Sequence, residues 1–286
     1  MLLDNLLCPT TVTIGVAHLF HATGFASGLN SAGWVKLSDL TKGNVAFPVP
    51  VSEIPGVVGN SAGVYAVVNN TSNTPGNLFQ VPPPALTPLG SVSNPIGGVA
   101  LIGPNIFFTT RQKGGVNGGL YQRSIGSTLP PQQVWMGTNP HGPVAANGTH
   151  VYWTQDNTIW RADAADPSKT LSWSGIPSAV RALAADDQRV WIGHDLGLHA
   201  LGVDIGAAGE AVVTAGTPVH GIVAKGGGAY FTQGDTLYQV VSGVVTAKVS
   251  GFIAPRGVAQ DAGNVYVADQ GHCSSLSDGK IVKVPK

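Results

Sequence analysis

Histidines and a few charged side chains carry the chemistry that this sequence offers. The chain has 286 residues, with 8 His, 15 Lys and Arg together, and 15 Asp and Glu together. His141 and His220 each precede a glycine shortly after a proline, and an imidazole in such a loop is a candidate general base. Other polar residues fall at or beside the ends of strand-like segments. These candidate ligand-binding residues are His21, Arg111, Gln155, His194, Gln233, Arg256, Asp269 and His272.

Imidazole, carboxylate and guanidinium groups gathered on one face would suit anion binding, proton transfer or a divalent metal. Asp269 and His194 are the candidate ligands for such a metal, calcium or magnesium. No other cofactor is indicated. Polar side chains at strand ends also satisfy backbone groups, so a structural role for the same residues stays open. His199 falls inside a strand-like segment, where we expect it to pack.

The elements that must position these residues form a repeat. An apolar or aromatic strand segment recurs about every 41 residues, beginning at Leu19, Val64, Ile106, Val151, Val190, Ala229 and Val265. Each is preceded by a proline and a short apolar strand, and each is followed by a third strand and, in most repeats, a weaker fourth. Four antiparallel strands per repeat of this length predict a β-propeller blade. A β-sandwich or solenoid built from the same strands is the alternative.

We therefore predict an all-β, seven-bladed β-propeller in a single domain, residues 1–286. The blades are expected to begin near residues 9, 55, 95, 140, 177, 218 and 255. The last repeat stops after its third strand, so residues 1–8 are expected to supply its outer strand and leave no unpaired edge.

The two cysteines support this closure, because Cys8 lies beside the first blade and Cys273 lies in a loop of the last. We predict a disulfide between them, with two free thiols as the alternative. A disulfide indicates an oxidising compartment, so we expect a secreted or periplasmic protein, with a cytoplasmic location still open. The first residues lack the basic region of a signal peptide, as in a mature form.

Composition narrows the partners. Positive and negative charges balance, and only 10% of residues are charged, which excludes a basic nucleic-acid footprint. No run approaches the roughly 18 apolar residues that a transmembrane helix needs. We expect a monomer that binds a small molecule or a protein on the face of the channel.

The segments 140–161 (PHGPVAANGTHVYWTQDNTIWR) and 255–269 (PRGVAQDAGNVYVAD) resemble the repeats of bacterial seven-bladed propellers. The second is similar to an NHL repeat, and the pattern also resembles streptogramin B lyases and, more loosely, lactonases of the gluconolactonase type. The lyase resemblance implies a histidine base, matched by His141 or His220, with a glutamate and magnesium nearby. Strand-end glutamates are missing, however, and the lactonase resemblance implies a metal site for which Glu53 and Glu210 are misplaced.

Three functions follow as hypotheses. The first is a non-catalytic, extracytoplasmic binding or interaction propeller with a His-rich ligand pocket on one face of the central channel. The alternative is a lyase or hydrolase with a histidine base. A lectin is a third reading, although the tryptophans fall mostly in strands expected to form the core.

Overall fold

The computed structural model describes residues 3–6, 8–15, 17–23, 31–48, 51–60, 63–70, 75–81, 86–137, 142–206, 209–213, 215–273 and 278–286. These residues form strands and connecting loops, and none lies in a helix. His141 is outside the described residues.

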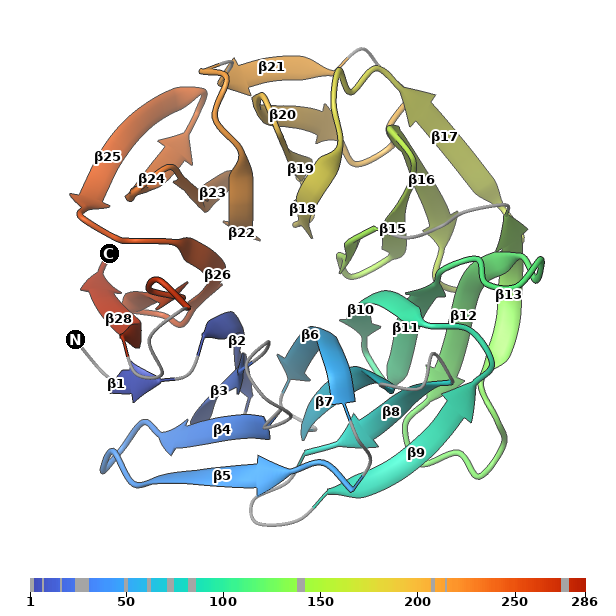
Figure 1. Ribbon diagram of the computed structural model, residues 1–286. Helices are drawn as coiled ribbons and strands as arrows, with labels where there is room; N and C mark the ends of the chain where they lie inside the picture. Colours follow the sequence, from blue (N-terminus) through green and yellow to red (C-terminus); the bar gives the residue numbers. More distant parts are fainter. Residues whose placement is uncertain are drawn as a thin grey trace. The chain divides into compact units, whose positions relative to one another are not determined.

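The strands form seven four-stranded antiparallel sheets, each a blade of a β-propeller (Figure 1). Blade 1 contains β2 (Pro9–Gly15), β3 (His18–Thr23), β4 (Ser31–Lys36) and β5 (Lys42–Ala46). Blade 2 contains β6 (Val51–Asn60), β7 (Gly63–Asn70), β8 (Gly76–Gln80) and β9 (Thr87–Val92). Blade 7 contains β26 (Pro255–Gln260), β27 (Asn264–Asp269), β28 (Gly279–Pro285) and β1 (Leu3–Leu6).

Four further blades follow the same order along the chain. Blade 3 contains β10 (Ile96–Ile102), β11 (Asn105–Thr110), β12 (Gly118–Ser124) and β13 (Gln132–Gly137). Blade 4 contains β14 (Val144–Ala146), β15 (His150–Gln155), β16 (Thr158–Asp163) and β17 (Thr170–Ser174). Blade 5 contains β18 (Val180–Ala185), β19 (Arg189–His194), β20 (Gly197–Gly202) and β21 (Glu210–Val213). Blade 6 contains β22 (Val219–Lys225), β23 (Gly228–Gln233), β24 (Thr236–Val241) and β25 (Val244–Ser250).

The chain divides into two compact units. The first unit, Met1–Ile96 with Gly251–Lys286, holds blades 7, 1 and 2. The second unit, Gly97–Ser250, holds blades 3 to 6 apart from the first residue of β10.

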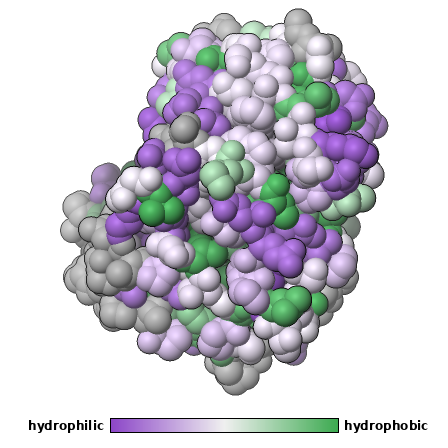
Figure 2. All heavy atoms as spheres, turned by 90° about the vertical axis from the view of Figure 1, so that its right-hand side faces the viewer, coloured by the Kyte–Doolittle hydropathy of each residue, from purple (hydrophilic) through white to green (hydrophobic). Residues whose placement is uncertain are grey.

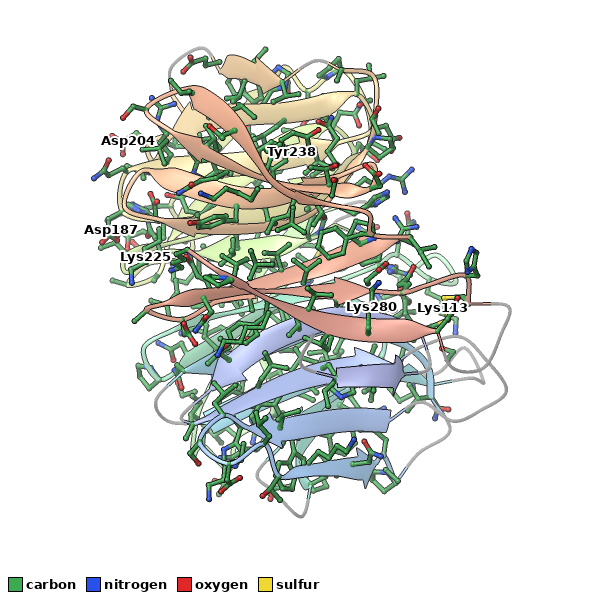
Figure 3. All side chains as sticks on the ribbon, turned by 90° about the vertical axis from the view of Figure 1, so that its left-hand side faces the viewer. Lys113, Asp187, Asp204, Lys225, Tyr238 and Lys280 are labelled. Carbon is green, nitrogen blue, oxygen red and sulfur yellow. A yellow bond between two sulfur atoms is a disulfide. The ribbon has the colours of Figure 1, made fainter. Side chains whose placement is uncertain are left out.

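The second strand of each blade forms the core. β11 and β19, for example, are buried from their second residue to their last. For β19, blades 4 and 6 of the same unit lie on either side, so its sequence is a continuous apolar run rather than an alternating one. In blade 6, Phe231 of β23 stacks on Tyr238 of β24, with ring centroids 5.3 Å apart. Tyr238 is labelled in Figure 3.

Outer strands are exposed and more polar. Met136 of β13 and Leu171 of β17 are among the few large apolar side chains that reach solvent there. Figure 2 shows such residues as separate spots among polar ones on the face that it draws. Isolated apolar residues of this kind are normal on a protein surface.

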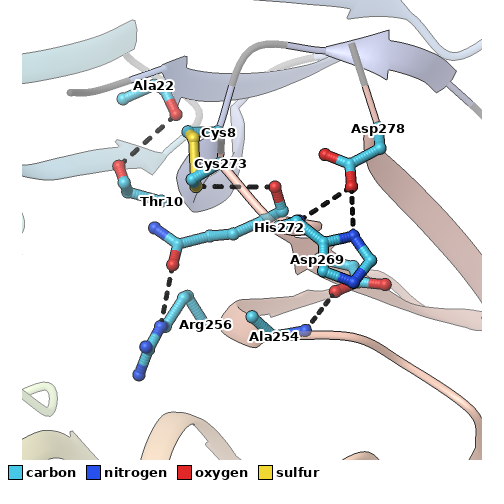
Figure 4. The surroundings of a disulfide bond; sticks show 10 residues. Cys8, Thr10, Ala22, Ala254, Arg256, Asp269, His272, Cys273 and Asp278 are labelled. Carbon is cyan, nitrogen blue, oxygen red and sulfur yellow. Dashed lines mark hydrogen bonds and ion pairs between the residues drawn. A yellow bond between two sulfur atoms is a disulfide. The ribbon is translucent and has the colours of Figure 1, made fainter. Parts of the chain in front are cut away.

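The N-terminal strand completes the last blade, as predicted. β1 pairs antiparallel with β28 through Leu3 opposite Ile281 and Leu6 opposite Gly279. Cys8 lies two residues after the end of β1 and forms a disulfide with Cys273, which lies in the loop after β27 (Figure 4). The predicted fold class and the predicted disulfide are thus both confirmed. Within the described part of the chain, no helix is both long and apolar enough to cross a membrane.

Candidate functional site

A cavity of about 310 Å³ lies in the first unit, between the outer strand of blade 7 and blade 1. It is lined by Leu3, Leu6, His21, Trp34, Lys42, Gly43 and Asn44. Its volume is at the lower end of the roughly 300–1,000 Å³ typical of ligand pockets. We call it the blade 1 cavity.

Blade 1 has a glycine, Gly33, at a third-strand position where the other blades have larger side chains. His21 of β3 pairs with Gly33 of β4, which pairs with Asn44 of β5, so the three residues share one face of the sheet. Aromatic side chains fill the place of His21 and Gly33 in three other blades: Phe108 with Tyr121, Trp153 with Trp160, and Phe231 with Tyr238. Each of these pairs is stacked.

Gly33 leaves room for the Nε2 and Cε1 atoms of the His21 imidazole above the backbone of β4. A methyl group at Gly33 would overlap His21 Nε2 and would lie 3.0 Å from Asn44 Oδ1. The two polar groups therefore border the space that a large third-strand side chain occupies elsewhere.

Burial sets the charge of His21. The side chain is only 3% exposed, and desolvation lowers its pKa to about 4, so it is neutral at pH 7. Its Nδ1 is buried and, among the described residues, has no hydrogen-bond partner. Such an unpaired polar atom is uncommon in a folded protein and calls for an explanation. Lys42, which is exposed, supplies the positive charge at the cavity, and none of its described lining residues is acidic.

Two predicted residues at strand ends bond the loop that precedes their own blade. Gln233 Nε2 donates to the carbonyl of Thr217 at 2.8 Å. The fully buried carboxylate of Asp269 accepts hydrogen bonds from the backbone N–H groups of Ile253 and Ala254, at 3.1 and 2.7 Å. Lys280 Nζ, labelled in Figure 3, lies 3.5 Å from Asp269. These contacts support the structural role that the sequence left open for such residues.

His194 occupies the same strand-end position in blade 5, but its partners are side chains. Its Nδ1 lies 2.9 Å from Ser178 Oγ, and its Nε2 lies 2.7 Å from His199 Nδ1. The backbone N–H of Leu196 also donates to His194 Nδ1, at 3.2 Å. That donation fixes Nδ1 as the acceptor, so Nε2 carries the proton and donates to His199. Burial, and secondarily His199, lowers the pKa of His194.

The remaining predicted residues lie in both units. In the first unit, Arg256 Nε donates to Gln270 Oε1 at 2.9 Å, and the exposed His272 bonds Asp278 through its ring and its backbone N–H (Figure 4). Arg111, Gln155 and His220 are in the second unit, where each has an interaction partner. Convergence of all these residues on one pocket stays a prediction.

The metal hypothesis rests on Asp269 and His194, which belong to different units. The described residues contain no group of three or more His, Cys, Asp or Glu side chains placed to hold a metal ion. Both Asp269 and His194 already have hydrogen-bond partners, as given above.

The lectin hypothesis needs tryptophan rings at the surface to stack on sugars. Trp153 and Trp191, the tryptophans of the second strands, are fully buried.

The sequence analysis missed Lys42 and Asn44 of the cavity, and Ser178 beside His194. A signal for the cavity was present: His21 stands in a run of otherwise apolar second-strand positions, and Gly33 stands where other blades have large side chains. No comparable signal marks Ser178, because its contact with His194 depends on how the loop before β18 folds.

Comparison with known proteins supports the fold. No family model matches the chain, and no curated protein matches it in sequence. Among solved structures, it is similar to the β-propeller domain of the Trilobed protease from Pyrococcus furiosus, with a TM-score of 0.69 and 10% identity, over 99% of this chain and 96% of that one. It is also similar to Kuenenia stuttgartiensis hydrazine synthase, with a TM-score of 0.74 and 11% identity, over 98% and 96% of the two chains.

A third similar structure is a puromycin-hydrolyzing peptidase of Mycobacterium tuberculosis, with a TM-score of 0.70 and 12% identity. The match covers 98% of this chain and 52% of the peptidase. The TM-scores establish a shared β-propeller fold, and at identities this low they establish no more than the fold. A propeller fold serves many unrelated functions.

Proposed function

We propose that the protein is a ligand-binding propeller that takes up a small molecule in the blade 1 cavity. The observation that carries the proposal is the buried imidazole of His21, which lines a cavity of about 310 Å³ against β1. In three other blades the equivalent space is filled by stacked aromatic rings.

The disulfide supports a location outside the cytoplasm. Structural disulfides form and persist in oxidising compartments and are rare in cytosolic proteins. We therefore propose that the protein binds its ligand in a secreted or periplasmic setting.

A screen of metabolite-sized neutral, anionic and cationic compounds, read by protein-detected NMR, tests the binding function. Asn44→Phe should fill the cavity and abolish binding. Ser172→Phe is the matched control, because Ser172 pairs with Trp160 as Asn44 pairs with Gly33, in a blade where Trp153 and Trp160 occupy the space. Binding that survives Asn44→Phe, or no binding by any compound, would contradict the proposal.

A second candidate function, a serine hydrolase, rests on the chain Ser178–His194–His199. Enzymes that hydrolyse esters through a covalent acyl-enzyme use a nucleophile that is hydrogen-bonded to a base, and a third group orients that base. In such a reaction Ser178 Oγ would attack an ester carbonyl and pass its proton to His194 Nδ1, which would return it to the leaving alcohol; water would then release the acyl group. Labelling by a fluorophosphonate that Ser178→Ala removes and the exposed-serine control Ser168→Ala retains would favour this candidate.

A further inference from the structure

The blade 1 cavity has a chemical character that narrows its ligand, provided that the proposed binding function holds. Lys42 is a cation at the cavity, and none of the lining residues among those described is an aspartate or glutamate. The positive charge of Lys42 favours an anion, since opposite charges attract.

The polar groups of the cavity offer hydrogen bonds suited to an acceptor. The imidazole of His21 is uncharged at pH 7, so one ring nitrogen carries a proton and the other does not. Nδ1 is enclosed without a partner, and Nε2 lies against Gly33 beside Asn44. The proton is better placed on Nε2 than on the enclosed Nδ1, because a buried donor without an acceptor is costly. The side-chain amide of Asn44 provides further donors.

Apolar side chains form the rest of the wall. Leu3 and Leu6 of β1 line the same space. An inorganic anion would leave this surface without a partner, whereas an organic anion with a compact apolar body would cover it and gain from its burial.

We propose that the ligand of the blade 1 cavity is a small monocarboxylate with an aromatic or branched aliphatic body. Its carboxylate lies against Lys42, the Nε2–H of His21 and the amide of Asn44, and its apolar body lies against Leu3 and Leu6. A carboxylate accepts hydrogen bonds from all three polar groups, and those made by or to a charged group are the stronger ones.

Calorimetric titration with benzoate, benzamide and benzylamine separates the contributions of charge and shape. The three probes share one ring and differ in charge at neutral pH. We expect benzoate to bind with one-to-one stoichiometry and at least about tenfold more tightly than the other two, the difference expected from a charged hydrogen bond.

Two variants and one control assign the site. Lys42→Gln should weaken benzoate binding about tenfold, for loss of one charged partner. Lys36→Gln is the matched control, because Lys36 lies in the same blade but pairs with Asp39 at 2.7 Å. His21→Phe should abolish binding by removing the donor and filling the cavity.

Each outcome has a meaning. Equal binding of benzamide, or benzoate binding unchanged by Lys42→Gln, overturns the carboxylate assignment while leaving a ligand-binding cavity. Preference for benzylamine overturns the assignment in the same way. Failure of all three probes, together with an empty screen of the broader panel, overturns the binding function itself.

Discussion

Acid should destabilise the folded protein through His21, and the size of the effect follows from its burial. Desolvation lowers the pKa of the folded imidazole to about 4, from 6.5 for an exposed one. Between these two values the unfolded chain binds a proton that the folded chain does not, so stability falls as the pH falls. At about 1.36 kcal/mol per pKa unit, the free energy of unfolding should drop by about 3 kcal/mol between pH 6.5 and 4 on account of His21 alone.

The variant His21→Phe isolates this contribution. Burial also lowers the pKa of His194, His199 and His150, so the wild-type protein loses more stability in acid than His21 explains. Those groups are common to both proteins, and the difference between the two curves reports His21. Urea unfolding followed by tryptophan fluorescence, at half-unit steps from pH 4 to 7, gives that difference.

Relative to wild type, His21→Phe should gain about 3 kcal/mol as the pH falls from 6.5 to 4. Phe231→Leu is the matched control, because Phe231 holds the equivalent second-strand position in blade 6 and does not titrate. Its cost should be independent of pH. Parallel curves for wild type and His21→Phe, or an imidazole of His21 that titrates near 6.5 by NMR, would refute the reasoning.

Three further predictions concern stability, each measured by denaturant unfolding. Removing the disulfide with Cys8→Ser and Cys273→Ser should lower the free energy of unfolding by about 2–4 kcal/mol. An equal loss on reducing the wild-type protein would attribute the effect to the bond. No loss would mean that β1 docks without the disulfide. Asp269→Ala should cost about 3 kcal/mol or more, because two backbone N–H groups lose their buried acceptor, whereas Asp187→Ala in an exposed turn should cost little; equal costs would contradict the role given to Asp269. Gly33→Ala should cost about 1–3 kcal/mol through its overlap with His21, and His21→Ala in the same chain should relieve it; additive costs would show that the two do not compete for space.

The repeat made the blades predictable. The segments beginning at Leu19, Val64 and Ile106 lie within second strands because apolar runs buried on both faces have a recognisable sequence. The N-terminal strand and the disulfide were also predictable, since a last repeat without an outer strand requires one from elsewhere, and two cysteines allow a single pairing.

The candidate site was less predictable. His21 stood out as a polar residue, but the sequence assigned it to the face of a central channel, together with residues such as Asp269. The structure places His21 beside a cavity against β1 and engages Asp269 in backbone hydrogen bonds. Side-chain direction and loop geometry decide these contacts, and neither follows from strand spacing, so the convergence of the predicted residues on one pocket stays a prediction. The role of Gly33 becomes visible only when each strand is compared across the blades in register.

Side-chain NMR of the histidine nitrogens tests the ligand-binding function most directly. Wild-type protein is titrated with the mixed panel of small neutral, anionic and cationic compounds while the nitrogen resonances of every histidine are followed. We predict that at least one compound shifts the His21 resonances saturably and that Asn44→Phe removes the shift. His21 resonances that no compound moves, with binding detected only at other histidines, would contradict the assignment of the blade 1 cavity as the ligand site.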